Sequence, residues 1–497
     1  MSDSNRTKIG YVKEVTYAVT PASPAIRNLR VKGVPLAFTP QTVESAELRS
    51  DRMLADLIRV GYESGGSLPL EVSWGNFDDL LEPAFQSAWQ RTPVRYNSAG
   101  ADTQITDVTV TTGVYTILTA AGTASDVNAG TFAVGHLVRA SGFTNSANNG
   151  LYRASAATAT SVTLGNTSVA ETAPPATARL KVVGFRGASG DITATATGLG
   201  CTTLNFTTLG LIVGQWIKIG GETAVEQFAT AALNNWARIT AIAATALTLD
   251  NLPSGWTTDA GSAKTITVYM GDVLKNGTTE QTLSIEVQMQ DLTTPEYDYY
   301  PGMAVDQFKI MMESQAIVEA EATFIGGGLP TNTTTRVSGA TDVSAPTNDV
   351  LNTSSNVGVV ADNNVALTGV SAVTSLELNF MNSLRRRNAV GSLSSVDIAS
   401  GTFRCDGRMT MYYGSNTIRT KILAGTASSF YTRTVDTTAP VNKRAYIVDL
   451  PRIKFKAGDP QAPGLDTDRT MDVEFAALAH TTLGYQASFQ RVEEYYQ

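Results

Sequence analysis

The chain has 497 residues, of which 42% are hydrophobic and 16% charged, and its formal net charge at pH 7 is −8. This length allows three or four domains, each with its own core. The acidic balance argues against a protein that grips nucleic acid by neutralising phosphates, because such proteins carry a basic face. No apolar run is long enough to cross a membrane, and the short polar N-terminus resembles no signal peptide, so we expect synthesis in a cytoplasm without processing.

From residue 11 to residue 38 the chain reads as extended, with polar residues between apolar ones. Pro21 and Pro24 interrupt this stretch. Proline cannot donate to a sheet ladder, so the segment is predicted to be an arm or an edge strand rather than a central strand.

A strand and a helix are predicted between residues 67 and 89. Residues 67–74 alternate polar and apolar side chains, which is typical of a half-buried strand. After Asn76, a predicted N-cap, apolar residues recur at helical spacing over 77–89. Asp78 and Asp79 fall in the first turn, where the helix dipole favours negative charge. Adjacent carboxylates on a helix point about 100° apart, so acid–base catalysis by this pair is the weaker interpretation.

Between residues 98 and 275 charged residues become sparse and Ala, Thr and Gly dominate, which marks an inserted region. Two parts of this region resemble each other at a spacing of about 80 residues, and such internal repeats indicate duplicated structural units. Each copy reads as short strands separated by turn residues, so we predict two tandem, immunoglobulin-like β domains at 98–189 and 190–275. The matched stretches are 132–139 with 211–218, 148–153 with 234–239, 162–166 with 247–251, and 180–184 with 267–271.

The chain then resumes with strongly alternating segments. Residues 282–290 alternate apolar and polar side chains without interruption, and 305–312 and 317–325 are predicted as further strands. The glycines at 326–328 lack the Lys and Ser/Thr of a phosphate-binding loop, so a flexible connection or a hairpin is expected there. Residues 331–369 are rich in Thr, Asn, Ser, Val and Ala, and are predicted to be a linker or long loop.

The C-terminal section repeats features of the N-terminal one. Residues 400–403 parallel 64–67, and 409–416 parallel 72–76, each followed by helically spaced apolar residues. We therefore expect two copies of one module, each of plausible domain size. The first would comprise residues 1–97 and 276–330, and the second residues 370–497.

Several short motifs recur in a characteristic order along the chain. They are 47–52, 61–66, 68–72, 77–81 and Trp89 before the inserted region, and 391–393, 400–401, 412–413, 450–455 and 466–476 after it. Their order, rather than any single motif, resembles the major tail tube proteins of long-tailed, siphovirus-like bacteriophages.

The resemblance implies a structural virion protein, made in the host cytoplasm, that forms stacked rings around a channel for genome passage. It implies mainly-β modules, each a sandwich or partial barrel with a flanking helix, whose inner strands join between subunits into one barrel and so leave no exposed sheet edges. It also implies N-terminal arms that reach neighbouring subunits, tape-measure and tail terminator proteins as partners, and genomic DNA that passes without sequence-specific binding. Two modules per chain favour a homotrimeric ring, with a hexameric ring as the alternative.

Four acidic residues are candidates for the channel surface. Glu319 and Glu321 lie two residues apart on one predicted strand, and Asp472 and Glu474 lie two apart on another, so each pair shares a strand face. A solvated sheet face is the simple interpretation. The functional hypothesis is that these residues face the lumen and repel DNA.

No catalytic, metal-binding or cofactor-binding residue is expected. His136 and His480 have no motif around them, and Cys201 and Cys405 lie far apart and are interpreted as buried small hydrophobes. The basic run 385–387 could contact phosphate, but a solvated turn or an inter-subunit salt bridge is the simpler interpretation.

Other functions stay open at this stage. The protein could be a minor tail or baseplate protein, or a carbohydrate-binding adhesin of the virion. An adhesin would need exposed aromatic platforms, for which Trp216, Trp236 and Trp256 are the candidates in the inserted region. A glycan hydrolase has no support beyond the presence of carboxylates.

Overall fold

The computed structural model describes residues 6–51, 53–97, 107–118, 132–158, 161–437, 443–462 and 464–496. These residues form two α-helices, α1 (Asp78–Phe85) and α2 (Thr417–Ala424), and are otherwise dominated by strands. The predicted mainly-β fold is therefore confirmed. No helix of the described part is long and apolar enough to span a membrane.

The larger of the two main sheets contains 18 strands, drawn from both ends of the chain. These strands are β1 (Thr7–Lys13), β2 (Ala25–Asn28), β3 (Ala37–Glu44), β4 (Leu57–Glu71), β18 (Asp272–Lys275), β19 (Leu283–Met289), β20 (Glu296–Glu313), β21 (Glu319–Gly326), β22 (Thr331–Thr333), β23 (Thr341–Val343), β24 (Val357–Asp362), β25 (Val365–Ala366), β26 (Val373–Met381), β29 (Arg404–Tyr412), β30 (Ser428–Asp436), β31 (Lys443–Ala457), β32 (Thr470–Ala477) and β33 (Ser488–Tyr495). A short separate hairpin consists of β27 (Arg385–Arg387) and β28 (Asp397–Ala399).

Antiparallel pairing joins seven of these strands in the order β4, β21, β20, β26, β29, β32 and β31, and we call this run the central sheet. Its strands alternate buried and exposed residues. In β21, for example, Ala320, Ala322 and Phe324 are buried, whereas Glu319 and Glu321 are half-buried. The central sheet therefore has one apolar face, which packs into the core, and one polar face.

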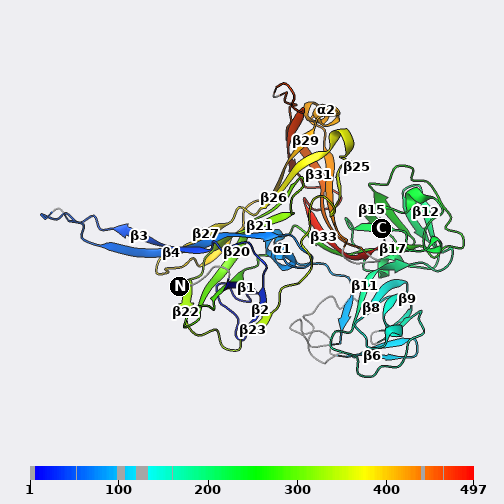
Figure 1. Cartoon of the computed structure of the whole chain (residues 1–497), viewed down its shortest axis with the longest axis horizontal. Coiled ribbons are helices and arrows are strands. Elements are labelled where there is room, and N and C mark those ends of the chain that lie inside the picture. Colours follow the sequence, from blue (N-terminus) through cyan, green and yellow to red (C-terminus); the bar gives the residue numbers. More distant parts are fainter. Residues whose placement is uncertain are drawn as a thin grey trace.

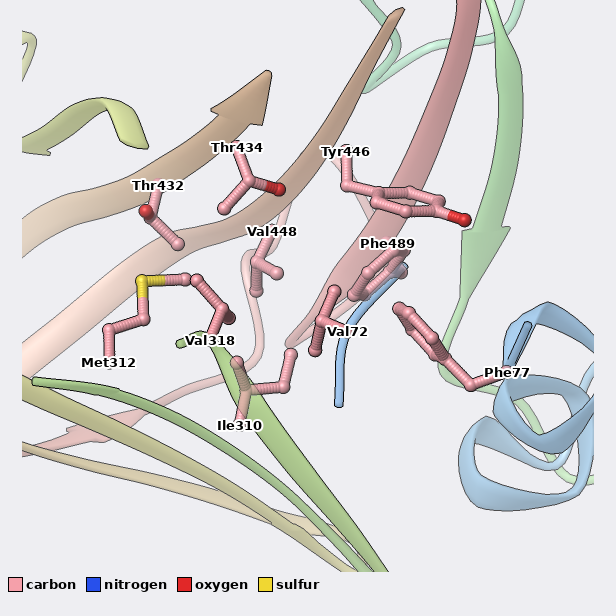
Figure 2. Close-up of a pocket in the computed structure, with 10 residues that line it drawn as sticks. All are labelled: Val72, Phe77, Ile310, Met312, Val318, Thr432, Thr434, Tyr446, Val448 and Phe489. Atoms are coloured by element: carbon pink, nitrogen blue, oxygen red, sulfur yellow. The ribbon is translucent and has the colours of Figure 1, made fainter. Parts of the chain in front are cut away.

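The core lies between the apolar face of the central sheet and a second layer made of β30, β33 and the N-terminal part of β31, which pairs with both. Phe77 at the start of α1 enters this core, where its ring centroid lies 5.4 Å from that of Tyr446 and 6.1 Å from that of Phe489. Figure 2 shows these rings around a small cavity of about 20 Å³. Its lining is almost wholly apolar, so it is a packing gap rather than a binding site for a polar ligand.

Strands from the first half of the chain and strands from the second half pair in the same order, and both sets have the same register irregularity. The register between β20 and β21 shifts between Val305 and Gln307, and the register between β31 and β32 shifts between Phe455 and Ala457. Gly66 lies opposite Phe324, as Gly407 lies opposite Phe475. This correspondence supports a duplicated module, although the exact domain boundaries stay a prediction.

The sequence match between the two halves used the wrong strand register. It placed Met409 with Val72, whereas the pairing of β29 and β4 places Met409 with Leu68. The reason is that the connection from β29 to α2 is shorter than the connection from β4 to α1. Motifs near the helices therefore cannot be aligned with the strands by spacing alone.

The inserted region forms a second sheet of 13 strands. The pairing of β11 with β17 joins the two repeats into one sheet, with Phe185 opposite Val268. The strands are β5 (Val94–Tyr96), β6 (Asp107–Thr111), β7 (Val114–Leu118), β8 (His136–Ser141), β9 (Gly150–Ala157), β10 (Ser161–Leu164), β11 (Arg179–Arg186), β12 (Ile192–Thr195), β13 (Gly198–Cys201), β14 (Trp216–Ile219), β15 (Trp236–Ile242), β16 (Ala246–Asp250) and β17 (Thr267–Tyr269).

One match between the repeats is also shifted by a residue. Arg153 lies opposite Leu137, as Arg238 lies opposite Trp216, so Arg153 corresponds to Arg238 rather than to Ile239. Neighbouring small and polar residues made both alignments plausible in sequence.

Three local predictions differ from the structure. Phe77, not Asn76, precedes α1 as its N-cap, because the Asn76 side chain instead bonds the backbone N–H and C=O of Arg30. The N-terminal strands β1 and β2 pair within the chain, and the projecting arm is the later β3–β4 hairpin (Figure 1). The expected linker 331–369 contains β22 to β25, paired with β20, β2, β30 and each other.

Candidate functional site

The register of the central sheet brings all four predicted acidic residues onto its polar face. Glu319 lies opposite Met311, Met311 opposite Glu377, Glu377 opposite Arg408, and Arg408 opposite Glu474. Residues directly opposite each other in an antiparallel pair point to the same face. Glu319 and Glu474 therefore share a surface although 155 positions separate them in the chain.

The other two acids lie on the same face, two residues along their strands. Glu321 lies opposite Lys309, and Asp472 lies opposite Thr410, whose hydroxyl donates to Asp472 Oδ1 at 2.6 Å. The period of two along a strand keeps Glu321 with Glu319 and Asp472 with Glu474.

Basic residues share this face, so it carries both positive and negative charges. Lys32 Nζ lies 2.5 Å from Glu319, Lys309 Nζ 3.4 Å from Glu377, and Arg408 3.8 Å from Asp472 Oδ2. In each pair at least one side chain is well exposed, and such surface pairs add little to stability. They are therefore features of the surface rather than supports of the fold.

Local sequence patterns do not single out these basic residues or Glu377. They lie on strands whose neighbours come from distant parts of the chain, and only the strand register shows which residues share a face. The two-residue period would have identified them if the order of the strands had been known.

The second feature is the β3–β4 hairpin, which extends away from the body of the molecule (Figure 1). Its two strands pair with each other from Ala37–Gly65 to Glu44–Leu57. The large apolar side chains along the hairpin are about half exposed or more. This is unusual for surface residues that lie together on one element. These residues are Phe38, Val43, Leu48, Met53, Leu54, Leu57, Ile58 and Val60.

Tryptophans of the inserted region lie at its contact with the second half of the chain. The ring of Trp216 lies 4.3 Å from that of Tyr431, and the ring of Trp236 lies 4.9 Å from that of Tyr495. Both tryptophans are buried. The prediction that they could form exposed sugar-binding platforms is therefore wrong. Trp256 is half-buried, and its indole N–H donates to the backbone of Thr195.

Buried charges also join the inserted region to the rest of the chain. Asp272 accepts hydrogen bonds from Lys181 at 3.2 Å and from Arg491 at 2.7 Å, and Arg491 also pairs with Asp78 in the first turn of α1. Burial opposes ionisation of Asp272, but Lys181 and Arg491 outweigh it and lower its pKa.

A neighbouring carboxylate extends this network. Burial would raise the pKa of Glu493, but Arg179 and Lys181 outweigh that effect and lower the pKa to about 2. Asp78 is thus part of an ion-pair network, and its neighbour Asp79 pairs with Arg27.

The histidines and cysteines have structural environments. Burial lowers the pKa of His136 to about 4, and its Nδ1 accepts the backbone N–H of Ala133. Gln215 accepts the backbone N–H of Ile212 in the same way in the second repeat. Burial raises the pKa of Cys201 to about 11 and also raises that of Cys405, so neither thiol is activated.

Two of the three arginines at 385–387 bind within the chain. Arg386 donates to the backbone oxygens of Gly326 and Ser64, and Arg387 pairs with Asp397 at 2.8 Å. The contacts of Arg386 fix the small β27–β28 hairpin against the central sheet, and the Arg387–Asp397 pair joins the two strands of the hairpin.

These features define a β-rich protein organised around one two-faced sheet, with a projecting apolar hairpin and a firmly docked inserted region. The chain matches a family model described as phage tail tube protein over residues 4–211 and 219–477, and it therefore belongs to that family. The matched residues include most of the inserted region. No curated protein matches the chain.

Proposed function

We propose that the protein polymerises into stacked rings that form the tail tube of a bacteriophage virion and the channel through which its genome passes. Family membership supports the tail tube, and the central sheet supports the ring. This sheet has a buried apolar face and a long solvated polar face, which suits the wall of an aqueous channel. The two equivalent sets of strands in each chain favour a homotrimeric ring with pseudo-sixfold symmetry over a hexameric one.

The β3–β4 hairpin supports the stacking of rings. Its apolar side chains are exposed in the single chain, and they would be covered if the hairpin lay against another copy. Heterologous contacts of this kind generate open tubes when they repeat along an axis. Tape-measure and tail terminator proteins would then set the length of the tube.

The polar face of the central sheet is the surface we assign to the lumen. The acidic residues Glu321 and Glu474 have no ion-pair partner among the described residues, so their charges would act on passing DNA. Repulsion between carboxylates and phosphates, without release of counterions, would keep DNA from adhering to the wall.

A charge-reversal experiment tests the lumen assignment. Virions that carry Glu321→Lys and Glu474→Lys should assemble normal tails but eject DNA more slowly, with a stronger effect at low salt. Glu222→Lys, an exposed position in the inserted region, serves as the matched control. Unchanged ejection in the double variant would contradict the lumen assignment.

The alternative functions are an adhesin and a minor tail or baseplate protein, and each can be tested by one property. An adhesin would need exposed aromatic platforms, and two of the three candidate tryptophans are buried. A minor tail or baseplate role would be distinguished by copy number in the virion, which is high for a tube protein and low for a baseplate protein.

A further inference from the structure

The two helices occupy equivalent places in the two halves of the chain, yet their environments differ. Every residue of α1 except Asp79 is buried. In α2 only Ile418 is buried, and the side chain of Leu423 is 79% exposed. Something that covers α1 is therefore absent from α2.

Strand β26 is part of what covers α1. The ring of Phe380 in β26 lies 5.0 Å from that of Phe85 in α1, and the side chain of Asn382 donates to the backbone oxygen of Ala84 at 3.0 Å. The same strand pairs with the C-terminal part of β20, with Lys309 opposite Asn379. Thus β26, from the second half of the chain, completes the first half.

The corresponding edge in the second half has no such strand. Ala457 corresponds to Gln307, because both follow the same register shift. Three residues after Ala457, Pro460 forms an isolated β-bridge with Met471. This bridge corresponds to the pairing of Ile310 with Ala320 in the first half of the chain. Within the described residues, the other edge of 457–461 pairs with no strand.

The counterpart of β26 in the first half is the start of β3. Phe38 lies opposite Ser64, as Phe380 lies opposite Cys405. Gly66 allows residues 35–36 to run close along β4, since a Cβ atom there would lie 2.2 Å from the Pro35 oxygen. Yet β3 pairs only with β4 among the described strands, and Phe38 is 52% exposed.

We propose that the start of β3 in a second copy of the chain covers this open edge and α2. Residues 35–39 of the second copy would pair antiparallel with 457–461, with Ala37 opposite Asp459 and Thr39 opposite Ala457. Phe38 of the second copy would then pack against α2 near Leu423, as Phe380 packs against α1. This inference rests on the proposed self-assembly and names the surfaces that make the ring contact.

The overall arrangement requires a second copy for this contact. In Figure 1 α2 lies at the top of the molecule and β3 far to one side, so the two cannot meet within one chain. Because one surface meets a different one, the contact is heterologous and can close a ring.

Prolines make this contact weaker than its intrachain equivalent. The N–H of Asn382 donates to the Asp306 oxygen at 2.8 Å, but its counterpart in β3 is Pro40, which has no N–H. Pro460 likewise replaces Ile310. Prolines on free edges also limit indiscriminate strand pairing before assembly.

Disulfide trapping tests the predicted register. The double variant Ala37→Cys with Asp459→Cys should yield covalent oligomers when assembled tubes are oxidised, because directly opposed residues in antiparallel strands approach closely enough to bridge. Each single variant should give no such ladder on denaturing, non-reducing gels. The matched positive control is Lys309→Cys with Asn379→Cys, which should close within one chain.

The outcomes separate this inference from the proposed function. Tubes visible by electron microscopy without inter-chain cross-links, while the positive control closes, would overturn the inference and leave the tube intact. Failure of the wild-type protein to form tubes would overturn both.

A second variant pair tests the helix contact. Leu423→Glu should leave the folded monomer unchanged in thermal unfolding but abolish tube formation. Val225→Glu, at an exposed site in the inserted region, should assemble as the wild type does. Normal assembly of Leu423→Glu would count against the contact.

Discussion

The inserted region and the projecting part of the β3–β4 hairpin both extend beyond the central sheet, but they differ in how their contact surfaces are used. The inserted region covers its aromatic side chains against the second half of the chain, as Trp216 does with Tyr431. The hairpin leaves its large apolar side chains exposed. In one case the contact is complete within the chain, and in the other we propose that a neighbouring copy completes it.

The inserted domains are held to the rest of the chain by more than aromatic contacts. Buried ion pairs such as Arg238 with Asp449 and Asp272 with Arg491 tie them to the rest of the chain. Charges are rarely buried without close partners, so these pairs fix one relative orientation. The inserted region is therefore held firmly against the rest of the chain, whereas the hairpin is the element that we propose for assembly.

Removing the central carboxylate of the buried network should have the largest effect. Asp272→Asn leaves Lys181 and Arg491 without full charge compensation, and breaking such a buried pair costs about 3–5 kcal/mol. The free energy of unfolding from urea or guanidinium denaturation measures this loss. Asp397→Asn, which breaks the exposed pair with Arg387, should cost no more than about 1 kcal/mol. Equal losses in the two variants would contradict the docking role of the network.

Lowering the pH should weaken the contact between the inserted region and the rest of the chain. The pKa of Glu493 is lowered to about 2 and that of Asp272 is also lowered, so the stability they contribute is fully present at neutral pH. It should be lost progressively as the pH falls below the unfolded carboxyl range near 4 towards 2. Thermal unfolding between pH 7 and pH 2.5 measures this slope, and Asp272→Asn should flatten it. A slope that the substitution leaves unchanged would show that other carboxylates dominate.

The hairpin should show the smallest effect on stability and a large effect on assembly. Leu54→Ser with Ile58→Ser changes exposed side chains only, so the free energy of unfolding should stay within about 0.5 kcal/mol of the wild type. Tube formation, followed by light scattering, should be lost. A variant that assembles normally would mean that the hairpin does not join neighbouring copies.

The strands and their polar and apolar faces could be predicted from the sequence, because alternation with a period of two is a local signal. This is why the sequence alone places Glu319 with Glu321, and Asp472 with Glu474, on one face of a strand, whereas their place in a lumen stays a prediction. That they share one sheet could not be predicted, since it depends on the pairing of β20 with β26 across the two halves. The burial of Trp216 and Trp236 likewise depends on a contact between distant segments.

Local sequence patterns also could not predict which segment forms the projecting arm. Residues 11–38 carry the prolines of an edge segment, whereas 43–60 carry the exposed apolar side chains. An apolar strand pattern normally indicates burial, so the sequence alone suggests the opposite of what is observed in the single chain.

Electron microscopy of the purified full-length protein tests the central claim most directly. We expect stacked rings with a central channel, and end-on averages with six similar lobes arranged with threefold symmetry, because each chain would supply two equivalent sets of strands. Particles that stay single at every concentration and salt condition would contradict the tube, and six chains in a ring would contradict the trimer.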